Sequence, residues 1–398
     1  MRILLCNKFY YRRGGDCIYT LNLEEMLASK GHQVAVFAMD YPDNLSSPWS
    51  SYFPSRVGFD SKFAFALRCM GYKGVKDRFS RLLDDFAPDV VHLNNIHSQL
   101  SPVIARIAHS RGIRVVWTLH DLKLLCPRYD CLRGGKEPCE LCFKNKFNVL
   151  RHRCMKNSLA ASCVAFAEAI KWNRVLLENS TDVFVCPSRF MRDKMLKGGF
   201  HESKLLHLNN AIDVSKCYRQ DYSDRSDYYC YIGRLSHEKG VESLTMAAAR
   251  LPYRLLVIGD GPLRGQLPQS DNIEYLGWQD WTRVKAIVES ARFTVMPSVC
   301  YENNPLSVIE SLCLGTPVLG ADIGGIPELI APGFSGLRFD SGNVDSLSSG
   351  IAEMFDMHFN YSAIAEESCR KFSQASYYDA LMKYAYSVSD GAEDGLKK

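Results

Sequence analysis

Two glutamates stand eight positions apart in the stretch YENNPLSVIESLCLGTPVLGADIGGIPELI, residues 301–330. Glu302 lies in a polar loop, and Glu310 lies within the apolar pattern that follows. By themselves, two such carboxylates are typical of general acid/base chemistry. Acids close to a helix start can also simply favour the helix dipole, which would account for Glu310 but not for the loop.

Pro305 suits the first helical position with Asn304 as N-cap, so we expect a helix over 306–314 that ends at Gly315. The residues expected to pack on a sheet are Val308, Ile309, Leu312 and Cys313. The residues expected on the opposite, polar face are Ser307, Glu310 and Ser311.

Two cations lie at the end of the apolar run 228–235 and just beyond it, in the segment RLSHEKG. Arg234 and Lys239 with a glycine at a strand-to-helix junction suit a diphosphate leaving group. A solvated loop with the same charges is the alternative.

Other candidate residues also follow expected strands. His120 and Asp121 come after 113–119, where a histidine can hydrogen-bond near a ligand or to a neighbouring carbonyl. Gly14 and Gly15 come after the first strand and open a helix, which favours anions or marks a plain turn. They do not form G-x-G-x-x-G, so a nicotinamide fingerprint is absent. The turn at 259–262 could bring backbone close to a nucleotide.

Short β-like runs alternate with helical patterns through most of the chain, which predicts βαβ units and parallel sheets. One round occupies the first half, with strands expected at 2–6, 33–38, 89–93, 113–119 and 182–188. A second round has strands expected at 228–235, 253–259, 273–278, 293–298 and 316–321. The polar stretch 207–227 separates them. Because ligands bind at the carboxyl ends of parallel strands, the residues above should converge.

Composition limits the class of protein. The 398 residues carry a net charge of +4, with the basic excess in residues 1–185 and an acidic excess in the remainder. A basic half could meet an anionic membrane or could simply be a solvated surface of mixed charge, while no aromatic RNA-binding signature supports nucleic acid. No apolar run reaches the roughly 20 residues that span a bilayer, and residues 1–15 do not suit a signal peptide, so we expect a cytoplasmic protein.

Taken together, these motifs resemble the family 4 glycosyltransferases. The resemblance covers nearly the whole chain. It lies in the Gly14–Gly15 pair with LASKGHQVAVF, in WTLHDLKLLCPRYD, in YIGRLSHEKGVESL, in the E-x7-E spacing of Glu302 and Glu310, and in LGTPVLGADIGGIPELI. It implies the α/β GT-B architecture, with two Rossmann-like domains facing each other across a donor-binding cleft. The expected boundaries are 1–208 for the acceptor side, 209–373 for the donor side, and 374–398 for a C-terminal helix and tail that returns toward the N-terminal domain.

The resemblance also implies roles for single residues. His120 would contact the donor sugar near the reacting carbon, Arg234 and Lys239 would neutralise the departing diphosphate, and Glu302 would bind sugar hydroxyls. Glu310 would bind the ribose. The remaining donor-binding residues implied by the resemblance are Gly14, Gly15, Gly233, Gly259, Leu276, Asn303, Asn304, Pro305 and Leu306. The chain lacks the Asp-x-Asp of metal-dependent enzymes, so no metal cofactor is expected.

The implied activity is retaining transfer of a sugar from a nucleotide sugar, with UDP as the expected nucleotide, to a lipid-linked oligosaccharide of a bacterial surface polysaccharide. The expected partners are the nucleotide sugar, the lipid-linked acceptor and the inner face of the cell membrane, contacted through the basic N-terminal half. No nucleic acid is expected. The alternatives are a sugar-nucleotide epimerase of the same fold and a non-catalytic nucleotide-sugar-binding subunit.

Two features depart from the family pattern. After the first glutamate, the family often has Gly-Phe-Gly, whereas this chain has Asn303, Asn304 and Pro305. This difference leaves the identity of the donor sugar undetermined. Five cysteines with the spacing C-x4-C-x7-C-x2-C-x11-C follow the His120 motif: Cys126, Cys131, Cys139, Cys142 and Cys154. They could hold a structural zinc, form disulfides or stay reduced.

Overall fold

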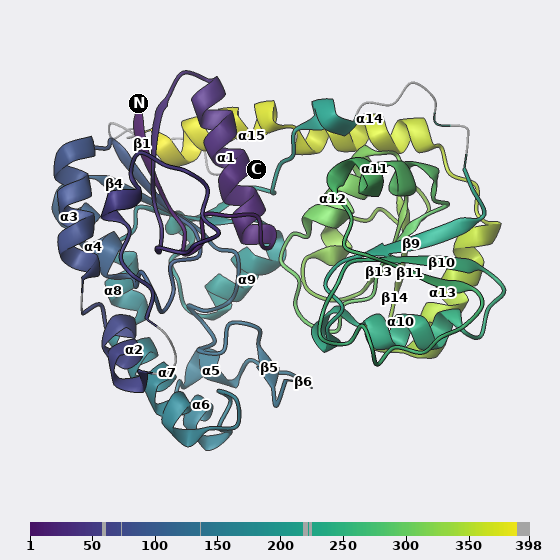
Figure 1. Cartoon of the computed structure of the whole chain (residues 1–398), viewed down its shortest axis with the longest axis horizontal. Helices are drawn as coiled ribbons and strands as arrows, with labels where there is room; N and C mark the ends of the chain where they lie inside the picture. The colour runs from purple at the N-terminus through teal and green to yellow at the C-terminus, as the bar shows by residue number, and fades with distance from the viewer. Residues whose placement is uncertain (58–60, 73, 136, 218–221, 223–224, 388–398) are drawn as a thin grey trace.

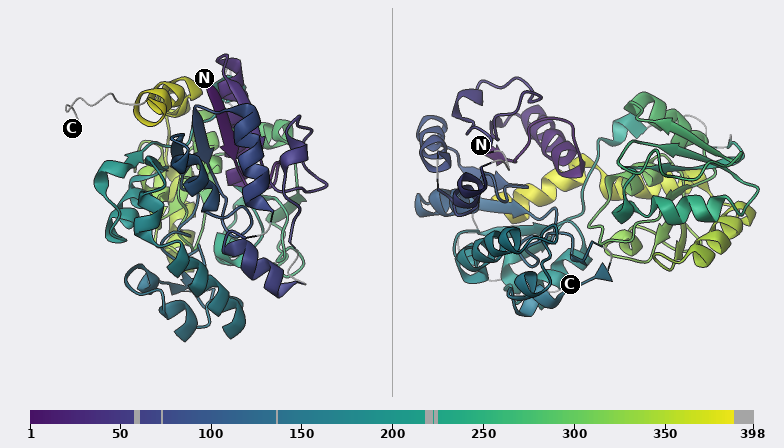
Figure 2. Two further views of the ribbon diagram at one scale, coloured as in Figure 1. Left: turned by 90° about the vertical axis from the view of Figure 1, so that its left-hand side faces the viewer. Right: turned by 60° about the horizontal axis from the view of Figure 1, so that its bottom comes forward.

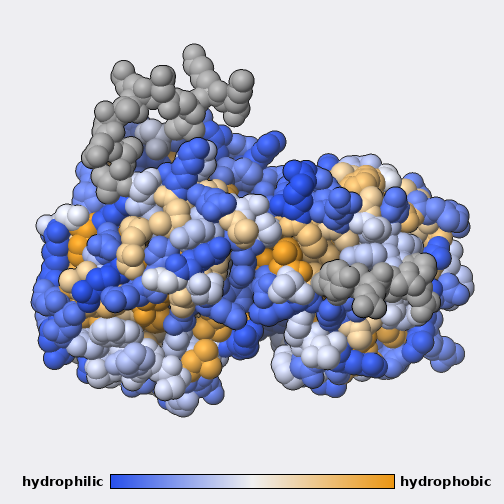
Figure 3. Space-filling model, turned by 90° about the horizontal axis from the view of Figure 1, so that it is seen from above, coloured by the Kyte–Doolittle hydropathy of each residue, from blue (hydrophilic) through white to orange (hydrophobic). Residues whose placement is uncertain are grey.

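The structure is a computed structural model that describes residues 1–57, 61–72, 74–135, 137–217, 222 and 225–387. It contains two lobes, each built on a six-stranded parallel sheet (Figure 1). The predicted pair of Rossmann-like domains is therefore confirmed. Seen from above, the surface is indented between the lobes (Figure 3).

The N-terminal sheet has the order β2-β1-β3-β4-β7-β8. Its strands are β1 (Arg2–Cys6), β2 (Gln33–Phe37), β3 (Val90–Leu93), β4 (Arg114–Thr118), β7 (Val183–Cys186) and β8 (Leu205–His207). The helices of this half are α1 (Gly15–Ser29), α2 (Lys62–Cys69), α3 (Val75–Phe86), α4 (Val103–Ser110), α5 (Leu141–Lys144), α6 (Asn148–Arg151), α7 (Leu159–Lys171), α8 (Arg174–Glu178) and α9 (Arg189–Lys197). A small hairpin, β5 (Leu132–Arg133) and β6 (Glu137–Pro138), lies in the loop between β4 and α5.

The C-terminal sheet has the order β11-β10-β9-β12-β13-β14. Its strands are β9 (Tyr228–Ile232), β10 (Arg254–Ile258), β11 (Ile273–Gly277), β12 (Thr294–Met296), β13 (Val318–Ala321) and β14 (Gly336–Phe339). Its helices are α10 (Val241–Ala248), α11 (Trp281–Ser290), α12 (Leu306–Cys313), α13 (Val344–Asp356) and α14 (Tyr361–Phe372). The sequence did not predict β8 and β14, which are short outer strands.

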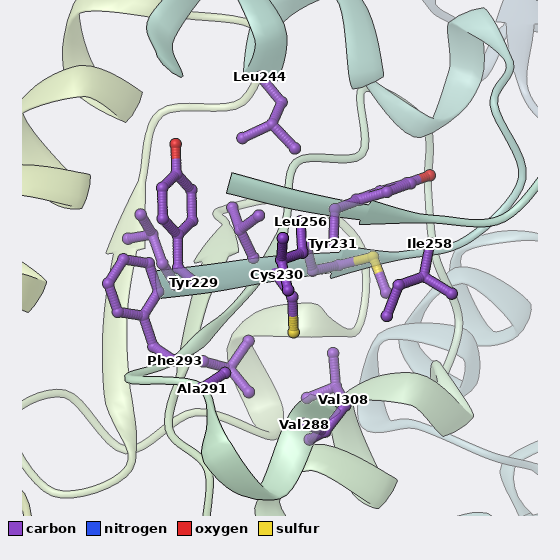
Figure 4. Packing of buried hydrophobic residues seen from close by; sticks show 14 of the residues in the cluster. Tyr229, Cys230, Tyr231, Leu244, Leu256, Ile258, Val288, Ala291, Phe293 and Val308 are labelled. Atoms are coloured by element: carbon purple, nitrogen blue, oxygen red, sulfur yellow. The ribbon is translucent and has the colours of Figure 1, made fainter. Parts of the chain in front are cut away.

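The core of the C-terminal domain is filled from both faces of its sheet (Figure 4). Leu244 of α10 lies on one side of β9, and Val288 of α11 and Val308 of α12 lie on the other. Tyr229 stacks on Phe293 with ring centroids 5.0 Å apart. This packing fixes β9 and β12 as neighbours, and the residues that follow these two strands form the candidate site.

The chain then returns to the N-terminal domain through α15 (Gln374–Ala380) and a π-helix over Leu381–Tyr386 (Figures 1 and 2). Tyr377 Oη contacts Tyr19 Oη of α1, and Tyr386 Oη lies 2.6 Å from His92 Nδ1 of β3. Leu381 and Ala385 are buried in a cluster with β1 residues. The two lobes are thus joined by a helix as well as by the connection between β8 and β9. The expected tail over 388–398 lies outside the described residues.

Candidate active site

The centre of the site is an ion pair between Lys239 and Glu302. Lys239 ends a short 3-10 helix over His237–Lys239 that follows β9, and Glu302 lies in the loop after β12. Since β9 and β12 are paired strands, the two loops meet, and Lys239 Nζ lies 2.6 Å from Glu302 Oε1. Ser298 Oγ donates a second hydrogen bond of 2.8 Å to the same oxygen. Oε2 has no partner among the described residues and is available to a ligand.

Electrostatics keep the Lys239 ammonium charged. Burial lowers the pKa of Lys239, but the Glu302 carboxylate outweighs that effect, and the pKa is raised above its usual value. The Lys239 side chain is 32% exposed and that of Glu302 is 13% exposed. The result is a fixed ammonium that a ligand can still reach. It contacts a carboxylate on one side and leaves further N–H donors for an incoming anion.

Arg234 adds a second cation on the same strand-to-helix loop. Its side chain is exposed and has no partner among the described residues, while its carbonyl accepts a hydrogen bond of 2.9 Å from Tyr231 Oη. The backbone is therefore held and the guanidinium is open to solvent. This arrangement suits an anion that binds and leaves.

Glycines at this edge allow backbone segments to touch. A Cβ at Gly259 would lie 2.0 Å from the Gly233 carbonyl oxygen, and the Gly259 N–H donates to the Gly277 carbonyl at 2.8 Å. Gly233 and Gly259 thus pack on each other. The Leu276 carbonyl accepts a hydrogen bond of 2.7 Å from Gln279 Nε2. These residues support the neighbouring loops, and their predicted contacts with the nucleotide remain predictions.

Gly324 and Gly325 clamp the Glu302 loop, a role that the sequence did not suggest. Gly324 has a φ of 63°, and a Cβ there would lie 2.3 Å from the Glu302 carbonyl oxygen. A Cβ at Gly325 would lie 1.8 Å from the Asn303 carbonyl oxygen. Only glycine permits this approach, so the Gly-Gly pair shapes the loop that carries Glu302.

The start of α12 differs from the expectation. The helix begins at Leu306 as predicted, but Pro305 is its N-cap residue and not its first helical residue. Asn304 does not cap the helix because its side chain is used elsewhere: its Oδ1 accepts a hydrogen bond of 2.8 Å from the Asn210 N–H. The first N–H groups of α12, at Leu306 and Ser307, have no partner within the helix and can serve a ligand.

The polar face of α12 is narrower than predicted. Ser311 is 1% exposed and its hydroxyl bonds to Thr294 Oγ1 of β12 and to the Thr316 carbonyl. The assignment of Ser311 to the polar face was therefore wrong, because its hydroxyl finds buried partners. Glu310 is half-buried, and burial raises the pKa of its carboxyl to about 7. No cation pairs with it among the described residues, so a ligand with hydroxyl donors would complete its surroundings.

Of the two asparagines after Glu302, Asn303 bonds to the N-terminal domain and Asn304 bonds to the connection between the domains. Asn303 Nδ2 donates 2.7 Å to the Leu119 carbonyl, beside His120, and Asn303 Oδ1 accepts 2.6 Å from Ser188 Oγ. Asn304 bonds to Asn210 through both its side chain and its carbonyl. Their side chains were not expected in this role. The predicted contacts of the Asn303, Asn304, Pro305 and Leu306 amides with the donor stay predictions.

A third contact between the domains is a helix cap. The Glu328 carboxylate of the C-terminal domain accepts hydrogen bonds from the Arg189 and Phe190 N–H groups, 2.8 Å and 2.5 Å long. These N–H groups begin α9 of the N-terminal domain. A carboxylate at a helix N-terminus satisfies free donors and the helix dipole together.

His120 lies two residues beyond β4 in the N-terminal domain, next to the Leu119 carbonyl that accepts a hydrogen bond from Asn303. Its Nε2 lies 3.0 Å from Asn94 Oδ1, and its ring packs edge-on against Tyr19 with centroids 4.8 Å apart. Burial lowers the pKa of His120 to about 4, so the imidazole is neutral at pH 7. With Asn94 Oδ1 as acceptor, Nε2 carries the proton and Nδ1 is an acceptor. Asn94, which directly follows β3, was missed, although its place after a strand was the available signal.

Gly14 and Gly15 lie where α1 begins. Gly14 is the N-cap in extended conformation and offers no side-chain cap, and nothing lies within 4 Å of a Cβ built on Gly15. Asp16 in the first turn accepts a hydrogen bond from Asn95 Nδ2 at 3.1 Å. The start of α1 therefore lies beside the residues that surround His120, and its N-terminus is open.

The five cysteines near the His120 loop are free thiols. Cys126, Cys131 and Cys142 are buried, and a hydrogen bond from the Cys131 thiol lowers the pKa of Cys126 to about 7. Within the described residues, no group of three His, Cys, Asp or Glu side chains is arranged to hold a metal ion.

Comparison with known proteins agrees with the fold. Two Rossmann-like domains of this kind are the GT-B architecture, which solved structures of glycosyltransferases share with this chain at TM-scores up to 0.70. A family model described as Glycosyltransferase Family 4 matches residues 13–216, and one described as Glycosyl transferases group 1 matches residues 219–377. The chain belongs to glycosyltransferase family 4 and is a glycosyltransferase.

The individual relatives described next share about a quarter of their aligned residues with this chain. An uncharacterized 42.6 kDa protein in the cps region of Klebsiella pneumoniae is 25% identical over 354 residues, covering 83% of this chain and 87% of the relative. The lipopolysaccharide 1,6-galactosyltransferase of Escherichia coli is 24% identical over 224 residues, covering 52% and 62%. Among solved structures, Anabaena HepE in complex with UDP has a TM-score of 0.66 at 15% identity, covering 96% and 99%.

The first prediction concerns the tie between the domains. Asn303→Ala removes two hydrogen bonds across the boundary, each worth about 1 kcal/mol. We expect kcat/KM to fall roughly tenfold while the Kd for nucleotide, measured by calorimetry, changes far less. Asn343→Ala is the matched control, because Asn343 caps α13 within one domain. Equal losses in both variants would show that Asn303 has no special role in joining the domains.

The second prediction concerns Glu310 and pH. Because its folded-state pKa is raised from 4.5 to about 7, the folded protein holds this proton more tightly than the unfolded chain, and stability falls as pH rises through that window. Glu310→Gln should therefore increase the free energy of unfolding more at pH 8 than at pH 5, by on the order of 1 kcal/mol or more. Urea unfolding at both pH values measures this. The exposed Glu353→Gln should show no such dependence, and a flat Glu310→Gln difference would contradict the assignment.

Proposed function

We propose that this glycosyltransferase retains the anomeric configuration of its donor, which is a UDP-linked sugar. It would transfer a hexosyl or N-acetylhexosaminyl group to a lipid-linked glycan during assembly of a bacterial surface polysaccharide. The transfer would take place at the cytoplasmic face of the cell membrane. The Klebsiella cps-region relative and the Escherichia coli galactosyltransferase support the pathway, and the HepE complex with UDP supports the nucleotide.

The observation that carries the proposal is the Lys239–Glu302 pair with Arg234 on the same loop. Cleavage of a nucleotide sugar leaves negative charge on the diphosphate while the sugar becomes cationic. Lys239 and Arg234 would stabilise the leaving diphosphate, a form of catalysis that prepositioned charges perform well. They supply this positive charge without a metal ion.

The carboxylates would orient the donor. Glu302 Oε2 would accept hydrogen bonds from sugar hydroxyls, and Glu310 would accept them from the ribose. The neutral His120 would contact the sugar from the opposite domain. The acceptor would attack on the face from which the diphosphate departs, and a phosphate oxygen would take the acceptor's proton. No covalent carboxylate nucleophile is then needed, in contrast to most retaining glycosidases.

The rival activities are less well supported. Membership of a glycosyltransferase family favours transfer over epimerisation and over binding without catalysis. An epimerase would convert the UDP-sugar without acceptor, and a binding subunit would tolerate the loss of Lys239. Incubation of UDP-sugars alone distinguishes the first, and the variant below distinguishes the second.

The third prediction concerns the nucleotide. UDP at about 100 times its Kd should stabilise the protein by roughly 2.7 kcal/mol, whereas GDP and ADP at the same concentration should stabilise it less. Thermal unfolding with each nucleotide and its sugar measures the difference. No shift with any nucleotide would contradict the donor site, and a larger shift with GDP or ADP would contradict UDP.

The fourth prediction concerns the leaving-group charge. Lys239→Ala should lower kcat by roughly 100-fold or more, since losing one preorganised charge stabiliser costs about that much. Arg250→Ala is the control, because Arg250 forms only an exposed pair with Asp345, and it should leave kcat unchanged. A tenfold or smaller loss in Lys239→Ala, in a protein that remains folded, would remove Lys239 from this role.

A further inference from the structure

One segment of the N-terminal domain is basic and has no acidic residue of its own. Between Glu140 and Glu168 the sequence contains neither Asp nor Glu. It carries five cations, Lys144, Lys146, Arg151, Arg153 and Lys156. This segment forms α5, α6 and most of α7, three helices that lie outside the parallel sheet (Figure 1).

The two acids that border the segment do not neutralise it. Glu140 is paired with Lys194 at 2.5 Å and with Lys197. Glu168 is buried and lies 2.9 Å from Lys123, which is also almost fully buried. Both carboxylates already face cations of the protein body. Within the segment, Lys146 is turned inward and its Nζ donates hydrogen bonds to the Leu124 and Leu125 carbonyls. The exposed charges of Lys144, Arg151 and Arg153 are therefore the ones available to an external anionic partner.

Large apolar side chains project from the same end of the molecule. Phe147 is 54% exposed and Leu159 is 53% exposed, and Phe63 of the neighbouring α2 is 75% exposed. Figures 1 and 2 both place α2, α5, α6 and α7 together at one end of the N-terminal domain. We call this end, residues 61–72 and 141–171, the basic apolar face. Its side chains are described except those of Lys62.

The exposed residues are not needed to hold the helices together. A separate small cluster of Cys142, Val149 and Ala165 does that, with Leu150 and Phe166 packed against it. Phe147 touches this cluster only at its edge, with its ring 6.2 Å from that of Phe166. In the C-terminal domain the exposed apolar residues are isolated on separate elements, as with Met246 and Phe334. Exposed apolar side chains grouped together mark an interaction surface.

The combination of charge and apolar side chains identifies the partner. Aromatic and aliphatic side chains surrounded by cations suit the headgroup region of an anionic bilayer, where rings enter the interface and lysine and arginine meet lipid phosphates. No helix among the described residues is long and apolar enough to cross a membrane, so contact of this kind would be at the surface. We propose that the basic apolar face binds an anionic membrane surface. The proposal rests on the proposed function only in taking the acceptor to be lipid-linked.

The position of the face suits delivery of such an acceptor. Leu141, 46% exposed, directly follows Glu140, and Glu140 Oε1 accepts a hydrogen bond of 3.0 Å from Tyr301 Oη. Tyr301 precedes Glu302. A continuous path of bonded residues thus joins the face to the loop that carries the candidate catalytic carboxylate.

The fifth prediction is tested by sedimentation of the full-length protein with vesicles. One kind of vesicle contains phosphatidylcholine alone. In the other kind, one third of the lipid is phosphatidylglycerol and the rest is phosphatidylcholine. We expect binding only to the anionic vesicles, with weaker binding as salt increases. The combined variant Lys144→Gln, Arg151→Gln and Arg153→Gln should bind at least tenfold less, since each cation near such a surface contributes roughly fivefold. All three side chains are exposed.

Two further variants make the result specific. Phe63→Ser with Phe147→Ser should also reduce vesicle binding at least tenfold, without changing the charge. Arg250→Gln, Arg254→Gln and Arg283→Gln remove the same number of exposed cations from the C-terminal domain and should leave binding unchanged. Thermal unfolding with and without UDP checks that each variant is folded and tests the donor site independently of the membrane.

Three outcomes would overturn the proposal, and a fourth would separate it from the proposed function. Equal vesicle binding by all variants would show that the basic apolar face does not contact the membrane. Equal binding to both lipid mixtures would contradict recognition of an anionic surface. Light scattering that shows a dimer dissociated by the phenylalanine variant, with no vesicle binding, would assign the face to a second copy of the chain. Vesicle binding without any UDP shift would uphold the face and reject the proposed function.

Discussion

The hydrogen bonds of Asn303 across the domain boundary are the constraint on which the site depends. One side chain reaches the carbonyl beside His120 and the hydroxyl that caps α9. The neighbouring Glu302 is thereby held at a fixed position relative to the N-terminal domain. Glu328 at the start of α9 acts in the same direction, and Asn304 holds the loop to Asn210 in the connection between the domains. Because these bonds flank the Glu302 loop, any opening of the domains must alter the surroundings of that carboxylate.

The ion pair of Lys239 and Glu302 explains how charge is stored there before a donor arrives. Burial in this place by itself lowers the pKa of Lys239 and so disfavours its charged form. The carboxylate reverses that effect and keeps the cation available for a diphosphate. Ser298 and the backbone approach allowed by Gly324 hold the carboxylate in turn. Glu302, which would bind the sugar, therefore also maintains the positive charge of Lys239, and that charge would assist departure of the diphosphate.

Strand positions and the convergence of the residues that follow them could be predicted from the sequence, because both depend on local alternation of apolar and polar residues and on a general rule for parallel sheets. What failed depended on distant partners. Asn304 fits an N-cap locally, but Asn210, far away in the sequence, takes its side chain. Ser311 is polar by type and buried in fact, since Thr294 of another strand satisfies it. Gly324 and Gly325 carry no local sign that they face the Glu302 loop.

Glu140 connects the two parts of the molecule that an enzyme acting on a lipid-linked substrate must coordinate. Burial raises the pKa of its carboxyl, but Lys194 and Lys197 outweigh that effect and lower it, so the group stays charged. As an anion it fixes the start of α5 to α9 through the lysines and accepts the hydrogen bond of Tyr301. The helix α9 is in turn capped by Glu328 from the other domain. A displacement of α5 on a membrane would therefore be transmitted through charged, partly buried contacts to the Glu302 loop.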